Sequence, residues 1–402
     1  MAVSNNLTIH YICPMQLSVI ILNYNVRYFL EQCVLSVEKA IQNLEAEIIV
    51  VDNHSSDDSC AMMRARFPHI KRIENKANLG FPKGNNIAVK EAKGEYICIL
   101  NPDTVVAEDT FEKILNSQLV TPNPEFGILG CKLIDGTGNF LPESKRGVPK
   151  PWVAFTKIFG LYKFFPNSTL FNQYYAQHLN ENQSGEVDIL VGAFMVMKRE
   201  LYLELGGFDE DCFMYADDID LSYRALLHGK KNYYFAETTV IHYKGESTVK
   251  DGTYMRRFQE AMQFFYQKHY QGSFFFSMFM RIGIVFFALV KMFQGKVSPK
   301  PVPEQYLLVS DTEALREKLT AVLQKSVERT TMENGKIVIS QTISKLKPTE
   351  VILDVDYLGF KKAMSFLKEN KNKSFTFKLL PPSSNFIIGS NSSNDRGEVI
   401  QI

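Results

Sequence analysis

The chain has 402 residues, 45% of them hydrophobic and 22% charged, which is typical of a folded protein with two or three domains. Its formal net charge of +1 gives no global electrostatic reason to expect nucleic acid as a partner. The six cysteines have no paired spacing, which argues against a zinc site or a disulfide framework and favours a reducing, cytosolic compartment.

Residues 1–16 form an N-terminal extension without the basic and apolar stretches of a signal peptide, and an alternating pattern follows them. Short apolar runs predict buried strands, and the segments between them carry helical spacing. The strands are expected at 17–22, 47–52, 70–74 and 96–100, and the helices at 27–42, 57–66 and, after a glycine-punctuated loop at 78–86, up to residue 92. Strands that alternate with helices predict a parallel, doubly wound α/β sheet.

Polar side chains follow three of these strands at the point where each strand ends. They are Asn23, Tyr24, Asp52, Asn53 and Asp103. Ligands of doubly wound sheets bind outside the carboxyl ends of the strands, so we expect these side chains to gather around one ligand.

The sequence pattern between residues 187 and 243 predicts a mixture of strands and helices. A strand-like run is expected at 187–198, a helix at 199–205 that ends at a glycine pair, a helix at 219–228 and a strand within 232–243 that carries His242. Asp217, Asp218 and Asp220 crowd three carboxylates into one turn before the second helix. Such crowding raises the pKa of each unless a cation compensates, which prepares a general base. The alternative is an acidic helix N-terminus that complements the helix dipole.

The segment 263–297 is rich in phenylalanine, and 274–293 approaches the length of a membrane span. Arg281 interrupts its middle, where arginine is costly in lipid. We expect a helix in the membrane interface whose Arg281 and Lys291 reach water; a helix buried against the protein and a true span stay open.

A proline-rich linker at 298–303 leads to a small α/β module at 304–402. Its strands are expected at 306–309, 336–340 and 351–355, its helices at 312–325 and 359–369, and a polar loop at 387–397. The module has no phosphate-binding glycine pattern, and the sequence assigns it no role.

Six sequence blocks stand in series between residues 17 and 250. They are SVIILNYN (18–25), IIVVDNHSSDDS (48–59), NLGFPKGNN (78–86), GEYICILNPDT (94–104), LVGAFMVMKRELYLELGGFDEDCFMYADDIDLSYR (190–224) and IHYKGEST (241–248). Together they resemble family 2 glycosyltransferases of the GT-A fold, and among these the rhamnosyltransferase-like enzymes that build bacterial cell-surface polysaccharides. The resemblance implies a Rossmann-like mixed sheet sandwiched by helices over 17–262, with a nucleotide-sugar half at 17–104 and an acceptor half at 105–262.

The resemblance also implies roles for single residues. Donor binding falls to Asn23, Tyr24, Asp52, Asn53, Asn78, Gly80, Asn86 and Asp103. The acceptor side comprises Gly192, Ala193, Asp217, Asp218 and Arg224, with Asp218 as first choice for the general base and Asp217 as second. Gly80 could equally serve turn geometry, Gly192 and Ala193 could be plain core, and Asp220 is expected to cap the helix or pair with Arg224.

A divalent cation, Mg²⁺ or Mn²⁺, is implied at Asp103, with His242 as a further ligand that would favour manganese. The family's metal motif is often Asp-x-Asp, whereas this chain has Asn101-Pro102-Asp103 and offers one carboxylate there. A structural histidine is the alternative for His242. The usual Glu-Asp of the acceptor-side motif is Asp217-Asp218 in this chain.

These features imply an inverting, metal-dependent transferase that moves a sugar, with dTDP-rhamnose as a candidate donor, onto a lipid-linked or growing cell-surface glycan at the cytoplasmic face of the membrane. The basic and aromatic insertion 140–186 would face a diphosphate-linked lipid acceptor or pack over the core. One alternative is a nucleotidyltransferase, which would carry a glycine-rich basic loop that SVIILNYN lacks. Another is a catalytically silent scaffold, which the presence of Asp103 and of Asp217-Asp218 disfavours.

Overall fold

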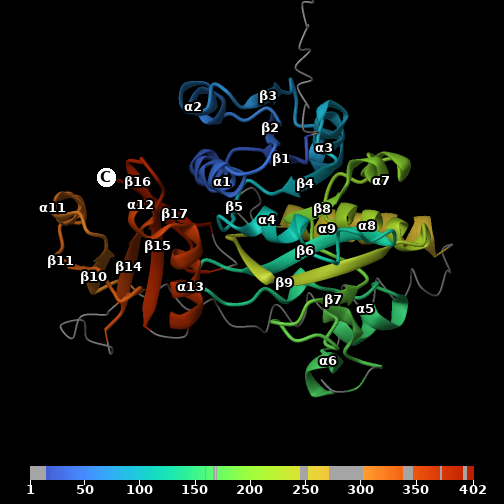
Figure 1. Cartoon of the computed structure of the whole chain (residues 1–402). Coiled ribbons are helices and arrows are strands. Elements are labelled where there is room, and N and C mark those ends of the chain that lie inside the picture. Colours follow the sequence, from blue (N-terminus) through green and yellow to red (C-terminus); the bar gives the residue numbers. More distant parts are fainter. Residues whose placement is uncertain are drawn as a thin grey trace, which may run out of the picture.

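The computed structural model of the chain describes residues 15–158, 160–165, 168, 170–244, 252–270, 302–337, 347–371, 374–392 and 396–402. Figure 1 shows a large central sheet with helices packed on it and a smaller C-terminal sheet beside it. The interfacial helix expected at 274–293 and most of the expected linker lie outside the described residues. Within the described ranges, no helix combines the length and the apolar character that crossing a bilayer requires.

The N-terminal half of the large sheet is parallel, as predicted. Its strands are β1 (Leu17–Asn23), β2 (Ala46–Asp52), β3 (Lys71–Glu74) and β4 (Tyr96–Leu100), in the spatial order β3-β2-β1-β4. The connecting helices are α1 (Arg27–Ala40), α2 (Ser59–Arg66) and α3 (Gly80–Glu91). β1 and β4 are buried throughout because helices cover both faces of the sheet. Val19 and Ile21 join the apolar core on one face, and Ile20 and Leu22 join the core on the other.

The loop expected at 78–86 is wrong in its second part, because α3 already begins at Gly80. Asn78 accepts a hydrogen bond from the Gly80 N–H through its side-chain oxygen at 3.0 Å, which forms a tight turn into the helix. Pro82 lies in the first turn, where its missing N–H is not needed. Gly80 therefore marks the start of this helix, and the loop before it is shorter than predicted.

The remainder of the large sheet is mixed. Its strands are β5 (Thr104–Val105), β6 (Phe126–Ile134), β7 (Gly185–Val187), β8 (Phe194–Lys198) and β9 (Lys231–His242). β8 runs antiparallel to both β4 and β6, while β9 pairs in parallel with β6 and antiparallel with β5 and β7. The predicted strand at 187–198 thus corresponds to two short strands, β7 and β8, separated by residues 188–193. A mixed α/β sheet with helices is confirmed.

Helices and turns of the second half complete the large unit. They are α4 (Thr110–Leu115), η1 (Pro142–Ser144), α5 (Pro151–Ile158), α6 (Leu161–Phe164), η2 (Gln173–Tyr175), α7 (Arg199–Glu204), α8 (Asp217–Leu227) and α9 (Gly252–His269). In Figure 1, α5 and α6 form a lobe at one side of the sheet, and α8 and α9 lie close together near β8.

The C-terminal module is a second α/β sheet of order β11-β10-β14-β15-β16-β17. Its elements are β10 (Gln305–Val309), α11 (Glu313–Leu323), β11 (Val327–Thr330), β14 (Thr349–Asp354), α12 (Val355–Leu358), α13 (Phe360–Asn370), β15 (Phe375–Leu380), β16 (Phe386–Gly389) and β17 (Glu398–Gln401), with the small hairpin β12 (Met332–Glu333) and β13 (Lys336–Ile337) apart from the sheet. The polar loop expected from 387 is wrong at its start, because Ile387 and Ile388 are fully buried in β16.

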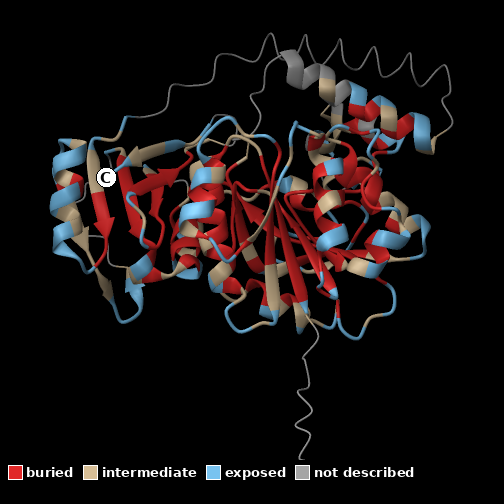
Figure 2. Cartoon of the chain, turned by 90° about the horizontal axis from the view of Figure 1, so that it is seen from above, coloured by how far each residue is buried: buried red, intermediate tan, exposed pale blue. Residues whose placement is uncertain are grey.

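This module shares a hydrophobic core with the large unit. Phe360 and Leu367 of α13 belong to the same buried cluster as Val105, Ile241 and Tyr243. Figure 2 shows buried residues at the centre of both units. Glu108 links them further, because its carboxylate accepts hydrogen bonds from the first free N–H groups of α13.

Candidate active site

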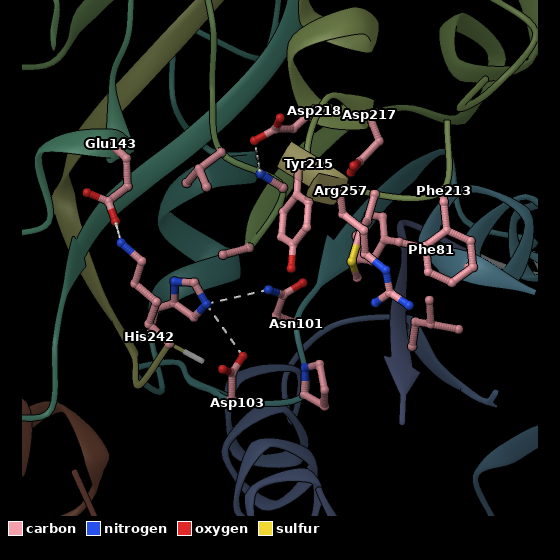
Figure 3. Close-up of a pocket in the computed structure, with 18 of the residues that line it drawn as sticks. Phe81, Asn101, Asp103, Glu143, Phe213, Tyr215, Asp217, Asp218, His242 and Arg257 are labelled. Atoms are coloured by element: carbon pink, nitrogen blue, oxygen red, sulfur yellow. Dashed lines mark hydrogen bonds and ion pairs between the residues drawn. The ribbon is translucent and has the colours of Figure 1, made fainter. Parts of the chain in front are cut away.

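A cavity of about 430 Å³ opens at the carboxyl edge of the large sheet. Ten of the residues predicted from the sequence line it: Tyr24, Asn53, Asn78, Gly80, Asp103, Gly192, Ala193, Asp217, Asp218 and His242. Figure 3 shows the Asp103–His242 corner on one side of this cavity and the acidic pair on another. Carboxylates more than a hundred positions apart in the chain therefore share one pocket.

The Asp103–His242 corner is built by strand pairing. Antiparallel pairing of β5 with β9 sets Thr104 opposite His242, and the Tyr243 N–H donates to the Asp103 carbonyl at 3.0 Å. His242 Nε2 consequently lies 3.5 Å from Asp103 Oδ1 and 3.4 Å from the Asn101 side-chain nitrogen. Both side chains are nearly buried but line the cavity, so an imidazole nitrogen and a carboxylate oxygen converge there.

These two side chains combine a carboxylate oxygen with an imidazole nitrogen, which is donor chemistry that suits a metal centre. Within the described ranges, no three His, Cys, Asp or Glu side chains are grouped as ligands of one ion. Cations such as Mg²⁺ and Mn²⁺ are commonly held by one or two protein ligands together with substrate phosphates and water. The Asp103–His242 pair fits that mode, and it does not fit a cage made of protein ligands alone.

The two adjacent aspartates at the start of α8 have different surroundings. Asp218 Oδ2 accepts a hydrogen bond from Arg146 at 2.6 Å and one from the Gly192 N–H at 3.0 Å, while Oδ1 accepts from the Ile219 N–H at 2.7 Å. Both partners of the Arg146–Asp218 ion pair are buried. Burial alone would lower the pKa of Arg146, but Asp218 holds it above its ordinary value. Asp218 is thus a fully compensated carboxylate.

Among the described residues, no lysine, arginine or histidine forms an ion pair with Asp217. Burial, and then the charge of Asp218, raise its pKa to about 7, against weaker stabilisation of the charged form by backbone hydrogen bonds and by the charge of Arg146. In Figure 3 its carboxylate points into the cavity, whereas that of Asp218 turns aside to the Gly192 N–H. Of the two carboxylates, Asp217 is therefore the one that can take up and release a proton near neutral pH.

The loop that carries this acidic pair is held in an unusual backbone conformation. Tyr215, two residues before Asp217, has φ of +77°, which is strained for a residue with a side chain. The preceding Phe213 accepts a hydrogen bond through its carbonyl from the Phe81 N–H at 3.1 Å, at the start of α3. A Cβ added at Gly80 would lie 2.9 Å from the Phe213 ring and 3.0 Å from its carbonyl oxygen. Gly80 therefore permits the donor-side loop and the acidic loop to meet.

The donor-side residues form a hydrogen-bonded framework at the ends of β1 and β2. Parallel register sets Asn23 opposite Asp52, and the Asn23 side chain donates to Asp52 at 2.8 Å. The Asn53 side chain donates to Asn78 and to the Gly80 carbonyl, both at 3.1 Å. Asn53, Asn78 and Gly80 line the cavity, whereas Asn23 and Asp52 lie behind it and orient the turn after β2.

Besides Asn23 and Asp52, two further residues predicted for the site do not line the cavity. The Asn86 side chain is hydrogen-bonded to the turn at Phe208. It donates to the Phe208 carbonyl and accepts from the Phe208 N–H. Arg224 pairs with Asp220 at 2.7 Å, as the sequence analysis allowed, and donates to the Gly207 carbonyl. Both residues anchor the glycine turn that precedes the acidic loop, so their positions support the site from outside.

Sequence reasoning missed several lining residues. Arg257 of α9 lies beyond the last sequence block, and no local pattern singled it out. Arg146 belongs to the basic insertion, but its pairing with Asp218 depends on a chain reversal that spacing does not reveal. Glu143 and Lys244 form an ion pair beside His242, visible in Figure 3, that was also not foreseen.

The chain is similar to several known proteins. The chain is 24% identical over 246 residues to an N-acetylglucosaminyl-diphospho-decaprenol L-rhamnosyltransferase of Mycobacterium tuberculosis, covering 58% of this chain and 78% of that protein. It is 28% identical over 227 residues to rhamnosyltransferase WbbL of Escherichia coli, covering 52% and 78%. A solved mannosyltransferase from Pyrobaculum calidifontis, in complex with GDP-mannose and Mn²⁺, is similar with a TM-score of 0.45 and 18% identity over 71% of this chain and 76% of that one.

Sheet, cavity and curated relatives together define an enzyme of the glycosyltransferase class. Residues 18–206 match the family model described as Glycosyl transferase family 2, so this chain carries a family 2 glycosyltransferase domain. The match covers β1 to β8 and ends just before the acidic loop.

Proposed function

We propose that the chain is an inverting, metal-dependent glycosyltransferase of the GT-A type, which transfers a sugar from a nucleotide donor to a hydroxyl of a lipid-linked or growing glycan. One observation carries this proposal: the Asp103–His242 corner and the acidic pair face the same cavity. Transfer needs a cation-binding corner for the leaving diphosphate and a base for the incoming hydroxyl, and the cavity offers both.

Asp103 and His242 would hold the divalent ion, and the histidine nitrogen favours Mn²⁺ over Mg²⁺. When bound, such an ion acts as a Lewis acid that neutralises the charge of a departing nucleoside diphosphate. The Asn101 side-chain nitrogen lies 3.4 Å from the same Nε2 that faces Asp103 and so contributes to the position of the imidazole. Binding of the nucleotide itself falls to the framework of Tyr24, Asn53 and Asn78, which lines the neighbouring wall.

Asp217 is the general base in this proposal, and Asp218 positions it. With a pKa of about 7, Asp217 can accept the proton of an acceptor hydroxyl at neutral pH. The hydroxyl oxygen then bonds to the anomeric carbon of the donor sugar as the bond from that carbon to the diphosphate breaks on the opposite face. A single displacement inverts the configuration. Asp218, neutralised by Arg146, fixes the first turn of α8 and the wall at Gly192.

The acceptor is proposed to carry a lipid. Support comes from the lobe of α5 and α6, where Trp152, Phe164, Phe165 and Leu170 are between 43% and 76% exposed. The same helix α5 lines the cavity through Lys157. An exposed apolar lobe beside a cationic pocket wall suits an amphipathic, anionic acceptor at the cytoplasmic face of a membrane. The names of the two curated relatives make rhamnose the first sugar to try, and the family resemblance of the sequence suggests dTDP-rhamnose as its donor.

The metal-binding role proposed for the Asp103–His242 corner is tested by ligand-induced thermal stabilisation. A ligand that binds only the native state raises the melting temperature of the protein. Mn²⁺ together with dTDP-rhamnose, and then with other nucleotide sugars, should raise the melting temperature of the wild-type protein more than either ligand alone. His242→Ala and Asp103→Asn should each abolish the added effect of the metal. Equal metal-dependent stabilisation in these variants would refute the assignment of the corner.

A further inference from the structure

The cavity wall opposite the Asp103–His242 corner carries a cation for which the described residues provide no carboxylate partner. Arg257 of α9 lines the cavity, and no carboxylate among the described residues forms an ion pair with it; its described neighbour is the Phe213 ring, 5.0 Å from the guanidinium carbon. The other basic lining side chains are engaged: Arg146 with Asp218, Lys244 with Glu143, and Lys157 with the Tyr174 ring at 3.5 Å.

The charges around the cavity explain why this cation matters. Asp103 and Asp217 bring negative charge to the cavity that no described lysine or arginine neutralises at contact distance, and a diphosphate would add at least two further charges. Like charges in a partly desolvated pocket repel strongly. A divalent ion at Asp103 and His242 would compensate one side only. Arg257 is the lining cation left to compensate the other side.

Arg257 is also aimed at the right space. Figure 3 shows its side chain directed into the cavity beside Phe81 and Phe213, across from Asp103 and His242. A guanidinium presents a planar fork of N–H donors that matches two phosphate oxygens at once. Its carbon lies over the Phe213 ring, and no described residue is hydrogen-bonded to the fork, which can therefore meet a ligand.

The helix that carries Arg257 is fixed to the helix that carries the proposed base. Asp220 of α8 is fully buried and binds His269 at 2.7 Å and Lys268 at 3.0 Å, both in the last turn of α9. The Tyr266 hydroxyl of the same helix donates to the Pro149 carbonyl at 2.5 Å. Arg257 therefore projects from a helix held in place before any ligand arrives, which reduces the entropy lost on binding.

We propose that Arg257 is a diphosphate-binding residue of this cavity and that it stabilises the diphosphate from the wall opposite Asp103 and His242. This inference rests on the proposed function. Two ligands have the required chemistry: the diphosphate of the nucleotide-sugar donor and the diphosphate of a lipid-linked acceptor. The two sources differ in which half-reaction depends on Arg257.

The test compares Arg257→Ala and Arg257→Lys with the wild-type protein and with Arg64→Ala as a matched control. Arg64 is an exposed arginine of α2, paired with Glu74 at 2.7 Å and absent from the cavity wall. Calorimetric titration with dTDP, UDP and GDP in the presence of Mn²⁺ measures the donor side without any acceptor. Titration with geranylgeranyl diphosphate, in the presence of the bound nucleotide, measures the acceptor side.

Loss of a charge-assisted hydrogen-bond pair should weaken binding of the sensitive probe about 10-fold to 100-fold in Arg257→Ala and less in Arg257→Lys. Arg64→Ala should bind as the wild type does. Weaker nucleotide binding identifies the donor diphosphate as the ligand of Arg257. Weaker binding of the isoprenoid diphosphate alone identifies the acceptor diphosphate as that ligand. Unchanged affinity for both probes in a folded Arg257→Ala protein overturns the inference and leaves the proposed function standing. A wild-type protein that binds no nucleoside diphosphate overturns both.

Discussion

At the scale of single residues, neighbours in the sequence differ because of what the fold places beside them. Asp217 and Asp218 are chemically identical, yet a buried arginine and two backbone N–H groups meet only Asp218. The sequence analysis singled out the acidic pair and placed Asp218 first as general base, whereas the contacts in the structure favour Asp217 for the role that we propose. The ranking depends on Arg146, which lies 72 positions away from Asp218 in the chain.

Asp217→Asn should abolish most transfer activity and stabilise the protein. Removal of a general base costs about 10²-fold to 10⁴-fold in rate. The raised pKa of Asp217 means that the folded state holds its proton more tightly than the unfolded state does. The resulting stability is complete below about pH 4 and is lost as the pH rises through about 7. The free energy of unfolding of Asp217→Asn should therefore exceed that of the wild type by up to about 4 kcal/mol above pH 7, and by little near pH 4.

Denaturant unfolding at several pH values measures that difference. Asp218→Asn is the matched control, because it has the same change of charge one residue away. It leaves the buried Arg146 without its partner and should destabilise the protein by roughly 3–5 kcal/mol at neutral pH. If both variants changed stability in the same direction, the division of roles between the two aspartates would be wrong.

At the scale of elements, the strands and helices of the donor half followed from the sequence because each carries its own signal. β1, β2 and β4 are continuous apolar runs closed by polar residues, and parallel pairing then fixes where those residues gather. β5 has only two residues and no such signal, although it aligns Asp103 with His242. Elements that short are defined by their partners, so the strand pattern alone could not show that Asp103 and His242 meet, and only the family resemblance implied both at one cation.

The contact between α3 and the acidic loop gives a prediction at this scale. Gly80→Ala would place a Cβ against the Phe213 ring and carbonyl, at a φ of +81° that alanine disfavours. We expect a loss of about 1–3 kcal/mol in the free energy of unfolding, together with weaker nucleotide binding.

Gly206→Ala is the control for that substitution. Gly206 has a similar φ of +80°, but nothing lies within 4 Å of the Cβ position there. Gly206→Ala should lose only the stability that the strained backbone costs, as measured by thermal melts. It should bind nucleotide normally, as measured by titration with dTDP. Equal effects of the two substitutions on nucleotide binding would show that the Gly80 contact does not shape the site.

At the scale of the whole molecule, the C-terminal module is joined to the catalytic unit by a common core. A stiff linker and a second strand pattern indicated a separate module, and its own sheet agrees with that pattern. The shared cluster of Phe360, Ile134 and Tyr243 could not be predicted, because apolar residues in two modules give no sign that they face each other. Tyr243 follows His242 directly, so this core also supports the proposed metal corner.

Phe360→Ala should therefore affect both units together. Truncation of a fully buried phenylalanine typically costs about 3–5 kcal/mol. Because the two units share this cluster, scanning calorimetry should show one unfolding transition that moves to lower temperature. Leu319→Ala is the comparison, since Leu319 is equally buried but belongs to a core within the module. Two separate transitions, of which Phe360→Ala shifts only one, would contradict a common core.

The central claim is that one cavity transfers a sugar from a nucleotide donor with Asp217 as the base. The most direct measurement is the initial rate of transfer from dTDP-rhamnose, or another nucleotide sugar, to a diphosphate-linked acceptor with Mn²⁺, followed from about pH 5 to about pH 9 in wild type and Asp217→Asn. We predict a wild-type rate that rises with pH and levels off above about pH 7, and a variant that binds the donor but transfers at least about 100-fold more slowly. Undiminished transfer by Asp217→Asn would contradict the account.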